Sequence, residues 1–228
     1  MALYFACLSA AAYLAKEFVG KWATTEQGYT GSKFIENGHA QAYFFEDSAS
    51  IVLAFRGSDN AADWDDNFKN KFRTEPCSDT HGCVHAGFKR HLDLIWDEIV
   101  TEINSGARQE KRLWICGHSL GGALATLAAS RFTTLFDRPV ASCFTYGAPR
   151  VGNYQWASAQ RFRLYRIVNK NDFVPTVPWP VTGWRHYGVE WYLSCNDEVF
   201  EFFPSWRRNL DQFVRLLVNC QSFDLDHW

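Results

Sequence analysis

The most constraining feature of the sequence is one short stretch, residues 115–122, which reads Ile-Cys-Gly-His-Ser-Leu-Gly-Gly. A β-type run leads into it, and a run of small, helix-forming residues (123–129) follows. In a Gly-x-Ser-x-Gly turn between a strand and a helix, the serine adopts strained backbone angles and the glycines let the two elements pass closely. The turn exposes the Ser119 hydroxyl at the end of the sheet, beside the positive end of the helix. The stretch therefore predicts Ser119 as a nucleophile.

The rest of the chain alternates between strand-like and helix-like runs. We expect strands at 42–45, 50–55, 113–116, 139–146, 164–168, 184–193 and 198–203. We expect helices at 3–19, 92–103, 123–129, 155–161 and 209–218. The first helix shows an apolar face at Leu3, Cys7, Ala10, Leu14 and Phe18, and a loop with Gly28, Gly31 and Gly38 follows it. Such alternation predicts a mostly parallel sheet covered on both faces, within a single domain, 1–228.

Composition narrows the classes of function. The 228 residues carry a formal net charge of −2 and show no basic stripe, which argues against a nucleic-acid partner. The N-terminus superficially resembles a secretion signal, but it lacks a basic region and continues as an amphipathic helix. Without a clear signal peptide, the protein is expected in the cytoplasm or exported by a non-classical route. Seven cysteines, an odd number, suit free thiols in a reducing compartment.

A serine nucleophile needs a base, and the base needs a carboxylate that orients it. In chains with this kind of serine turn, the order is serine, then acid, then histidine. Asp172 follows a buried strand directly, so its carboxylate can reach the edge of the sheet where Ser119 lies. The candidates for the base are the two histidines after Asp172. His227 lies in a loop and is preferred, whereas His186 lies in a strand-like run and is the second choice.

These motifs resemble those of the class 3 lipases, the fungal-lipase-like branch of the α/β-hydrolase superfamily. The matching stretches run in family order: Phe-Arg-Gly-Ser (55–58), Val-His-Ala-Gly-Phe (84–88), Gly-His-Ser-Leu-Gly-Gly-Ala (117–123), Tyr-Gly-Ala-Pro-Arg-Val-Gly-Asn (146–153), Asn-Asp-x-Val-Pro (171–175) and Asp-His (226–227). The opening helix, with Ala12 and Tyr13, is also similar. The resemblance implies an α/β-hydrolase fold, in which a central, mostly parallel (mixed) sheet is flanked by helices and a short lid segment lies nearby.

The resemblance also implies roles for individual residues. Ser119 is expected to be the nucleophile, Asp172 the acid and His227 the base. His186, in a His-x-Gly-x-Glu setting with Gly188 and Glu190, is expected to be structural. The oxyanion hole is expected to use Ser58 and the backbone N–H of Leu120, because two donors aimed at the tetrahedral oxygen stabilise charge that develops only in the transition state.

The family's lid corresponds to residues 59–70, with Trp64 and Phe68 as its apolar side chains. This segment departs from the family pattern, since it carries four aspartates and has Asn67 where the family usually has an aspartate. A lid that opens onto lipid should present an apolar face. We therefore expect activity on soluble or dispersed esters at least as high as on emulsified fat. A solvated helix face is the other interpretation of the four acids.

No metal site or cofactor is predicted. Cys77, His81, Cys83 and His85 lack paired Cys-x-x-Cys spacing, and His85 belongs to a family motif. A loop disulfide between Cys77 and Cys83, or free thiols, is the preferred interpretation. Residues 147–152 are rich in glycine, but no Lys-Ser/Thr follows, so we expect a tight connection between elements and not a phosphate loop.

The leading hypothesis for function is a serine hydrolase that cleaves acyl esters of lipids through an acyl-enzyme. One alternative is a phospholipase that acts on membrane phospholipids. An alternative of another class is a lipid-binding module that has kept the fold but not the chemistry. The expected partners are an acyl-ester or lipid substrate and a transient lipid interface, and we expect a monomer.

Overall fold

The core of the fold is a seven-stranded sheet in a computed structural model that describes residues 1–58, 74–76, 82–169 and 172–193. Its strands are β1 (Gly31–Asn37), β2 (Ala40–Glu46), β3 (Ser50–Phe55), β6 (Arg112–His118), β7 (Val140–Tyr146), β9 (Leu164–Asn169) and β11 (Val189–Leu193). They lie in the order β1-β2-β3-β6-β7-β9-β11. The pairings among β1, β2 and β3 are antiparallel, and the remaining pairings are parallel. The predicted mixed, mostly parallel sheet is confirmed.

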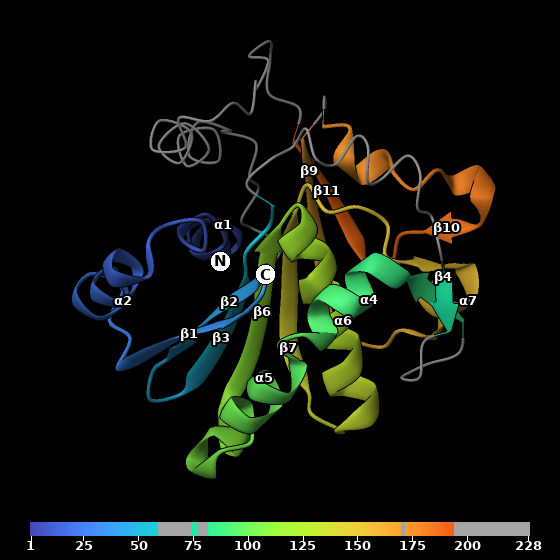
Figure 1. Ribbon diagram of the computed structural model, residues 1–228. Coiled ribbons are helices and arrows are strands. Elements are labelled where there is room, and N and C mark those ends of the chain that lie inside the picture. Colours follow the sequence, from blue (N-terminus) through green and yellow to red (C-terminus); the bar gives the residue numbers. More distant parts are fainter. Residues whose placement is uncertain (59–73, 77–81, 170–171, 194–228) are drawn as a thin grey trace.

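Helices cover both faces of this sheet (Figure 1). α1 (Ala2–Ala11) and α2 (Lys16–Thr25) lie on one side. α4 (Ala86–Asp93), α5 (Trp96–Ile103), α6 (Leu120–Leu135) and α7 (Tyr154–Ala159) lie on the other. Short 3₁₀ helices are η1 (Gly106–Glu110), η2 (Val174–Thr176) and η3 (Pro180–Thr182).

The two-sided cover explains the near-continuous apolar runs of the central strands. Successive residues of a strand point to opposite faces. Phe44 and Leu53 pack with α4–α7, whereas their neighbours Phe45 and Val52 pack with α1 and α2. Because most positions on the central strands are buried, the strands read as nearly continuous apolar runs without alternation.

A second, four-stranded antiparallel sheet joins distant parts of the chain. It contains β4 (Thr74–Pro76), β5 (Cys83–His85), β8 (Gly152–Asn153) and β10 (Trp184–Arg185), in the order β10-β8-β5-β4. The predicted strand 184–193 is therefore wrong as one element. Its two ends belong to different sheets, and Gly188 lies between them at φ 89°.

The predicted helix at 3–19 is also wrong, since it is two helices with a turn between them. Tyr13 and Leu14 donate backbone hydrogen bonds three residues back, and Ala15 is extended. The Tyr43 hydroxyl donates to the carbonyl oxygen of Leu14 at 3.1 Å, so a contact from a distant strand holds the turn. The expected apolar face fails as well, because Leu3 and Phe18 are exposed.

Two further boundaries differ from the sequence-based expectation. The loop with Gly28, Gly31 and Gly38 contains β1, an edge strand in which only Ile35 is buried and which therefore lacks an apolar signal. The expected helix at 92–103 breaks after Asp93, so α4 and α5 are separate. The predicted strand at 198–203, helix at 209–218 and lid at 59–70 lie outside the described residues.

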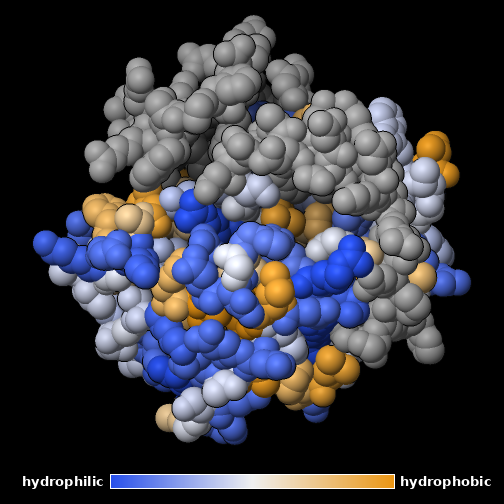
Figure 2. All heavy atoms as spheres, viewed as in Figure 1, coloured by the Kyte–Doolittle hydropathy of each residue, from blue (hydrophilic) through white to orange (hydrophobic). Residues whose placement is uncertain are grey.

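The described surface on the side of α4 and α5 is mostly hydrophilic, with a few apolar patches (Figure 2). These helices are strongly amphipathic and turn Asp97 and Glu98 outward while Ile99 and Ile103 are buried. Among the described residues, no helix has the length and apolar character needed to cross a bilayer.

Candidate active site

Ser119 lies between β6 and α6 in a strained turn. Its backbone angles are φ 59° and ψ −124°, a region that costs a residue with a side chain about 1–3 kcal/mol. The surroundings hold the strain: the Ser119 N–H donates to Tyr146 O at 2.9 Å, and Ser119 O accepts from the Gly122 N–H at 3.0 Å. The strained serine predicted from the motif is therefore present at the carboxyl end of β6.

The flanking glycines are required by close backbone contacts. A Cβ on Gly117 would lie 2.3 Å from Gly121 O, and a Cβ on Gly121 would lie 2.3 Å from Phe55 O. Side-chain movement could not relieve these clashes, because the opposing atoms belong to the backbone. The strand and helix pass each other as closely as the motif predicted.

The segment with Ser58 lies beside this turn. Phe55 pairs with Gly117, so the chain leaves β3 next to the serine turn. A Cβ on Gly57 would lie 2.7 Å from His118 O, which places the Gly57 backbone directly against the residue that precedes Ser119. Leu120 is the first residue of α6. The structure thus brings the segment of Ser58 next to Ser119 and Leu120, which lie far from Ser58 in sequence.

Asp172 reaches the same edge of the sheet. It follows β9, and its Oδ1 accepts the Val174 N–H at 2.9 Å. Its Oδ2 lies so close to Gly147 that a Cβ there would be 2.4 Å away. Gly147 directly follows Tyr146, the residue that accepts the Ser119 N–H. The predicted nucleophile and acid therefore follow β6 and β9, two parallel strands separated by β7, at the same edge of the sheet.

The electrostatics of Asp172 reflect this partly buried position. Burial raises the pKa of its carboxyl group, and the hydrogen bond from the Val174 N–H opposes that rise. A carboxylate of this kind is poorly solvated and gains from a positively charged neighbour. It is suited to stabilise a histidine that becomes protonated during a reaction.

Tyr13 is a residue whose role the sequence did not predict. Its hydroxyl lies 2.9 Å from Nδ1 of His118 and against the Gly57 backbone, where a Cβ would approach it to 2.1 Å. Burial lowers the pKa of His118 from 6.5 to about 4, so this ring is neutral. One phenol from the turn after α1 therefore contacts the residues that precede both Ser58 and Ser119. The similarity of Ala12-Tyr13 to the family was the only signal in the sequence.

His186, the second choice for the base, has other partners. Its Nε2 lies 2.8 Å from Pro175 O and must carry a proton, because a carbonyl oxygen only accepts. Burial, with Arg166 and Arg150 nearby, lowers its pKa from 6.5 to about 3. The preferred base His227 and the lid residues Trp64 and Phe68 lie outside the described residues.

Of the group Cys77, His81, Cys83 and His85, the structure describes Cys83 and His85, and His85 has a structural role. Nδ1 of His85 accepts the Phe88 N–H at 3.3 Å and caps α4. Cys83 is a free cysteine, which disagrees with the disulfide alternative, while Cys77 and His81 lie outside the described residues. Within the described part of the chain, no group of three or more metal-ligating side chains comes together.

Comparisons with known proteins agree with this geometry. Residues 52–182 match the family model described as Lipase (class 3). The secreted mono- and diacylglycerol lipase 1 of Fusarium solani is 32% identical over 197 residues, which are 81% of this chain and 57% of that protein. The secreted mono- and diacylglycerol lipase A of Penicillium cyclopium is 34% identical over 158 residues, 64% of this chain and 49% of that protein. The chain thus spans about half the length of the curated relatives it matches.

A solved structure shows the same fold. A mutant form of MDLA from Penicillium cyclopium superposes with a TM-score of 0.72 at 26% identity, covering 87% of this chain and 80% of that one. The family match, the strained serine turn and the mixed sheet all lead to the same conclusion. The chain belongs to the class 3 lipase family and has an α/β-hydrolase fold.

Proposed function

We propose that the protein hydrolyses carboxylic esters of lipids with Ser119 as the nucleophile. The observation that carries this proposal is the strained Ser119 at the end of β6, with the partly buried carboxylate of Asp172 after β9 at the same edge of the sheet. Strain of this kind persists where the surroundings enforce it, and it is concentrated at active sites.

In the proposed reaction His227 accepts the proton of Ser119 as the hydroxyl attacks the ester carbonyl. Asp172 orients the protonated histidine, and Ser58 with the Leu120 N–H stabilises the oxyanion. The alcohol leaves with the proton from His227, and an acyl-enzyme forms. Water, activated by the same histidine, then releases the acid and restores Ser119.

For the substrate we propose mono- and diacylglycerols, because the relatives with about one-third identity are named for these lipids. The alternative is a phospholipid ester. Three apolar side chains are exposed in the segment after Asp172: Phe173, Trp179 and Val181. They support the proposed transient contact with a lipid interface. Apolar side chains exposed beside a site are typical of surfaces that meet lipid or a partner.

The first test is hydrolysis of p-nitrophenyl butyrate, monoacylglycerol, diacylglycerol and phosphatidylcholine by the wild type and variants. Ser119→Ala and His227→Ala should each lose about 10⁴-fold or more in kcat, whereas Ser142→Ala, a serine on β7, should retain full activity. If His186→Asn abolished activity while His227→Ala remained active, the assigned base would be wrong. A wild type inert on every ester would favour the lipid-binding alternative.

A further inference from the structure

Four successive carbonyl oxygens in the segment after Asp172, those of residues 175–178, accept hydrogen bonds from two residues, Arg150 and His186. Residues 175 and 178 are prolines, which have no N–H with which to hold the segment. The bonds run from Nε2 of His186 to Pro175 O at 2.8 Å, from Nη1 of Arg150 to Thr176 O and, at 3.0 Å, to Pro178 O, and from the Arg150 N–H to Val177 O at 2.8 Å.

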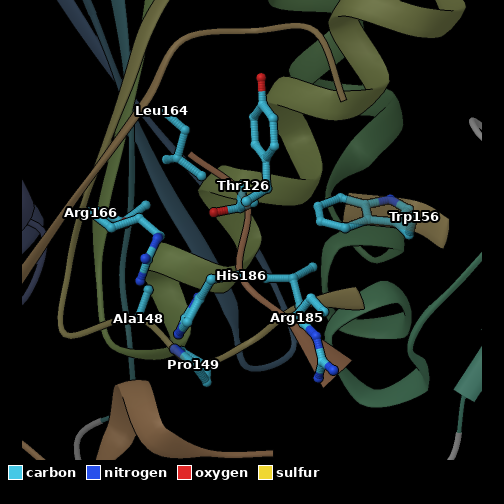
Figure 3. A pocket seen from close by; sticks show the side chains of 11 residues that line it. Thr126, Ala148, Pro149, Trp156, Leu164, Arg166, Arg185 and His186 are labelled. Atoms are coloured by element: carbon cyan, nitrogen blue, oxygen red, sulfur yellow. The ribbon is translucent and has the colours of Figure 1, made fainter. Parts of the chain in front are cut away.

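Both donors come from the small four-stranded sheet. β8 pairs antiparallel with β10, and Gly152 lies opposite Arg185. Arg150 lies two residues before β8, and His186 directly follows β10, so the pairing brings both to the same end of the small sheet. In Figure 3 His186 points toward Pro149, the neighbour of Arg150, and both line a small pocket that Thr126 of α6 also lines. The small sheet thus presents two donors together to residues 175–178.

The segment held in this way is joined directly to Asp172. Oδ1 of Asp172 accepts the Val174 N–H at 2.9 Å, and Val174 O accepts the Val177 N–H at 3.2 Å. The carboxylate is therefore bonded into a compact turn, η2, within the same short segment. Arg150 and His186 hold that turn from outside.

The setting of Arg150 is unfavourable for a cation. Burial chiefly, and then the nearby charges of Arg166 and Arg185, lower the pKa of its guanidinium, while Glu190 opposes this effect. A partly buried cation next to like charges is a cost to the folded state. Groups that cost stability are typical of functional sites, where position matters more than stability. A role beside Asp172 explains this placement better than a contribution to folding does.

We infer that Arg150 and His186 are positioning residues that hold the carboxylate of Asp172 in place for its histidine partner. This inference rests on the proposed function, in which Asp172 orients the base. Each residue acts through the backbone of residues 175–178 and not through a contact with substrate. A displacement of about 1 Å in a catalytic group can cost on the order of 10²-fold in rate. Loss of these contacts should therefore lower kcat and leave KM nearly unchanged.

Steady-state hydrolysis of p-nitrophenyl butyrate by the full chain tests the inference. Arg150→Met removes two hydrogen bonds and should lower kcat about 10- to 100-fold, and His186→Met removes one and should lower it about 3- to 10-fold. KM should stay within about twofold in both variants. His186→Gln keeps an amide donor of similar reach and should restore most of kcat.

Arg161→Met is the matched control. Arg161 also donates to two carbonyl oxygens through Nη1, at 2.8 and 2.7 Å, but these belong to Ser158 and Gln160 near the end of α7. Its removal should leave kcat at the wild-type value. His186→Met keeps the inference testable if Arg150→Met does not fold.

A double-mutant cycle separates positioning from a general loss of structure. If His186 acts through Asp172, adding His186→Met to Asp172→Asn should change the residual kcat by less than about 1.5-fold. A loss of structure unrelated to Asp172 would instead multiply the effects of the two substitutions.

Three results would overturn the inference and leave the proposed function standing. The first is wild-type kcat in both Arg150→Met and His186→Met. The second is a loss in His186→Met that His186→Gln does not reverse, and the third is a loss that multiplies with that of Asp172→Asn. A wild type inert on every ester would overturn the proposed function and this inference with it.

Discussion

At the scale of single residues, Tyr13 shows how a side chain outside the proposed triad can position it. Its hydroxyl touches both His118 and the Gly57 backbone. Removing the hydroxyl frees two segments that carry Ser119 and Ser58, without altering either residue. A residue that acts in this way affects the rate of the chemical step more than the binding of substrate.

We therefore predict that Tyr13→Phe lowers kcat for p-nitrophenyl butyrate roughly two- to tenfold with little change in KM, the amount expected for one lost hydrogen bond. Tyr4→Phe is the matched control, because it removes the hydrogen bond from the Tyr4 phenol of α1 to Tyr29. Tyr4→Phe should lower stability by a similar amount but leave kcat unchanged. Equal kcat losses in both variants would show that Tyr13 acts only through stability.

Gly147 supports a second prediction at this scale. It has φ 56°, and a Cβ there would lie 2.4 Å from Oδ2 of Asp172. Gly38 has φ 60° and open space around it. Replacing either glycine by alanine should destabilise the fold by about 1 kcal/mol in urea unfolding, because the backbone strain is alike. Only Gly147→Ala should also lower kcat, by about 10²-fold, because it displaces Asp172. Matching kcat values for the two variants would contradict the assigned role of Asp172.

At the scale of elements, the close approach of α6 to β3 leaves no space for a methyl group at Gly121. The glycine in α2, Gly20, has space for one. A Cβ on Gly20 in α2 would make only an ordinary contact, 3.5 Å from Ser32 Oγ, whereas a Cβ on Gly121 in α6 would lie 2.3 Å from Phe55 O. Gly20→Ala should stabilise the protein by about 0.5–1 kcal/mol through helix propensity. Gly121→Ala should destabilise it by about 1–3 kcal/mol through overpacking. Urea denaturation of both variants tests this prediction. A change in the free energy of unfolding of the same sign in both variants would contradict it.

The elements that the sequence predicted correctly are those fixed by local pattern. The strand, serine turn and helix at 112–135 follow from apolar residues, glycines and small residues next to one another. The turn at 12–15 could not be predicted, because its stabilising contact comes from Tyr43, 29 residues away from Leu14. The edge strand β1 was missed because a strand with a single buried residue carries no apolar pattern.

In the candidate site, too, the sequence predicts what local pattern and chain order determine, but not the contacts between distant residues. Chain order and strand ends placed Asp172 near Ser119, because the ends of parallel strands meet at one edge of the sheet. The contact between Tyr13 and His118 joins residues 105 positions apart, and no periodicity in the sequence indicates it. The contacts of Arg150 and His186 with residues 175–178 depend on the pairing of β8 with β10, which local patterns do not fix.

At the scale of the whole molecule, four partly or fully buried histidines in the described part of the chain make stability depend on pH. Burial lowers their pKa values from 6.5, to about 4 for His85, His91 and His118 and to about 3 for His186. Below pH 6.5 the unfolded chain takes up protons at these sites before the folded protein does. The free energy of unfolding is therefore unaffected by protonation of these histidines above pH 6.5, and it decreases as the pH falls from 6.5 toward 4.

We predict that the urea midpoint falls steadily between pH 7 and pH 5 at constant ionic strength. His91→Gln should flatten this slope, because it removes one of the four groups and glutamine can still donate to His39 O, the present partner of His91. A midpoint that stayed constant or rose between pH 7 and pH 5 would contradict the assignment of neutral, buried histidines.

The central claim is that Ser119 is an activated nucleophile, and covalent labelling tests it most directly. The full chain is treated with a p-nitrophenyl alkylphosphonate, and the modified residue is located by mass spectrometry of its peptides. We predict one phosphonyl group per chain, on Ser119, with loss of esterase activity in proportion and much slower labelling of Asp172→Asn and His227→Ala. Stoichiometric labelling of another residue, or an active enzyme that leaves Ser119 unlabelled, would contradict the account.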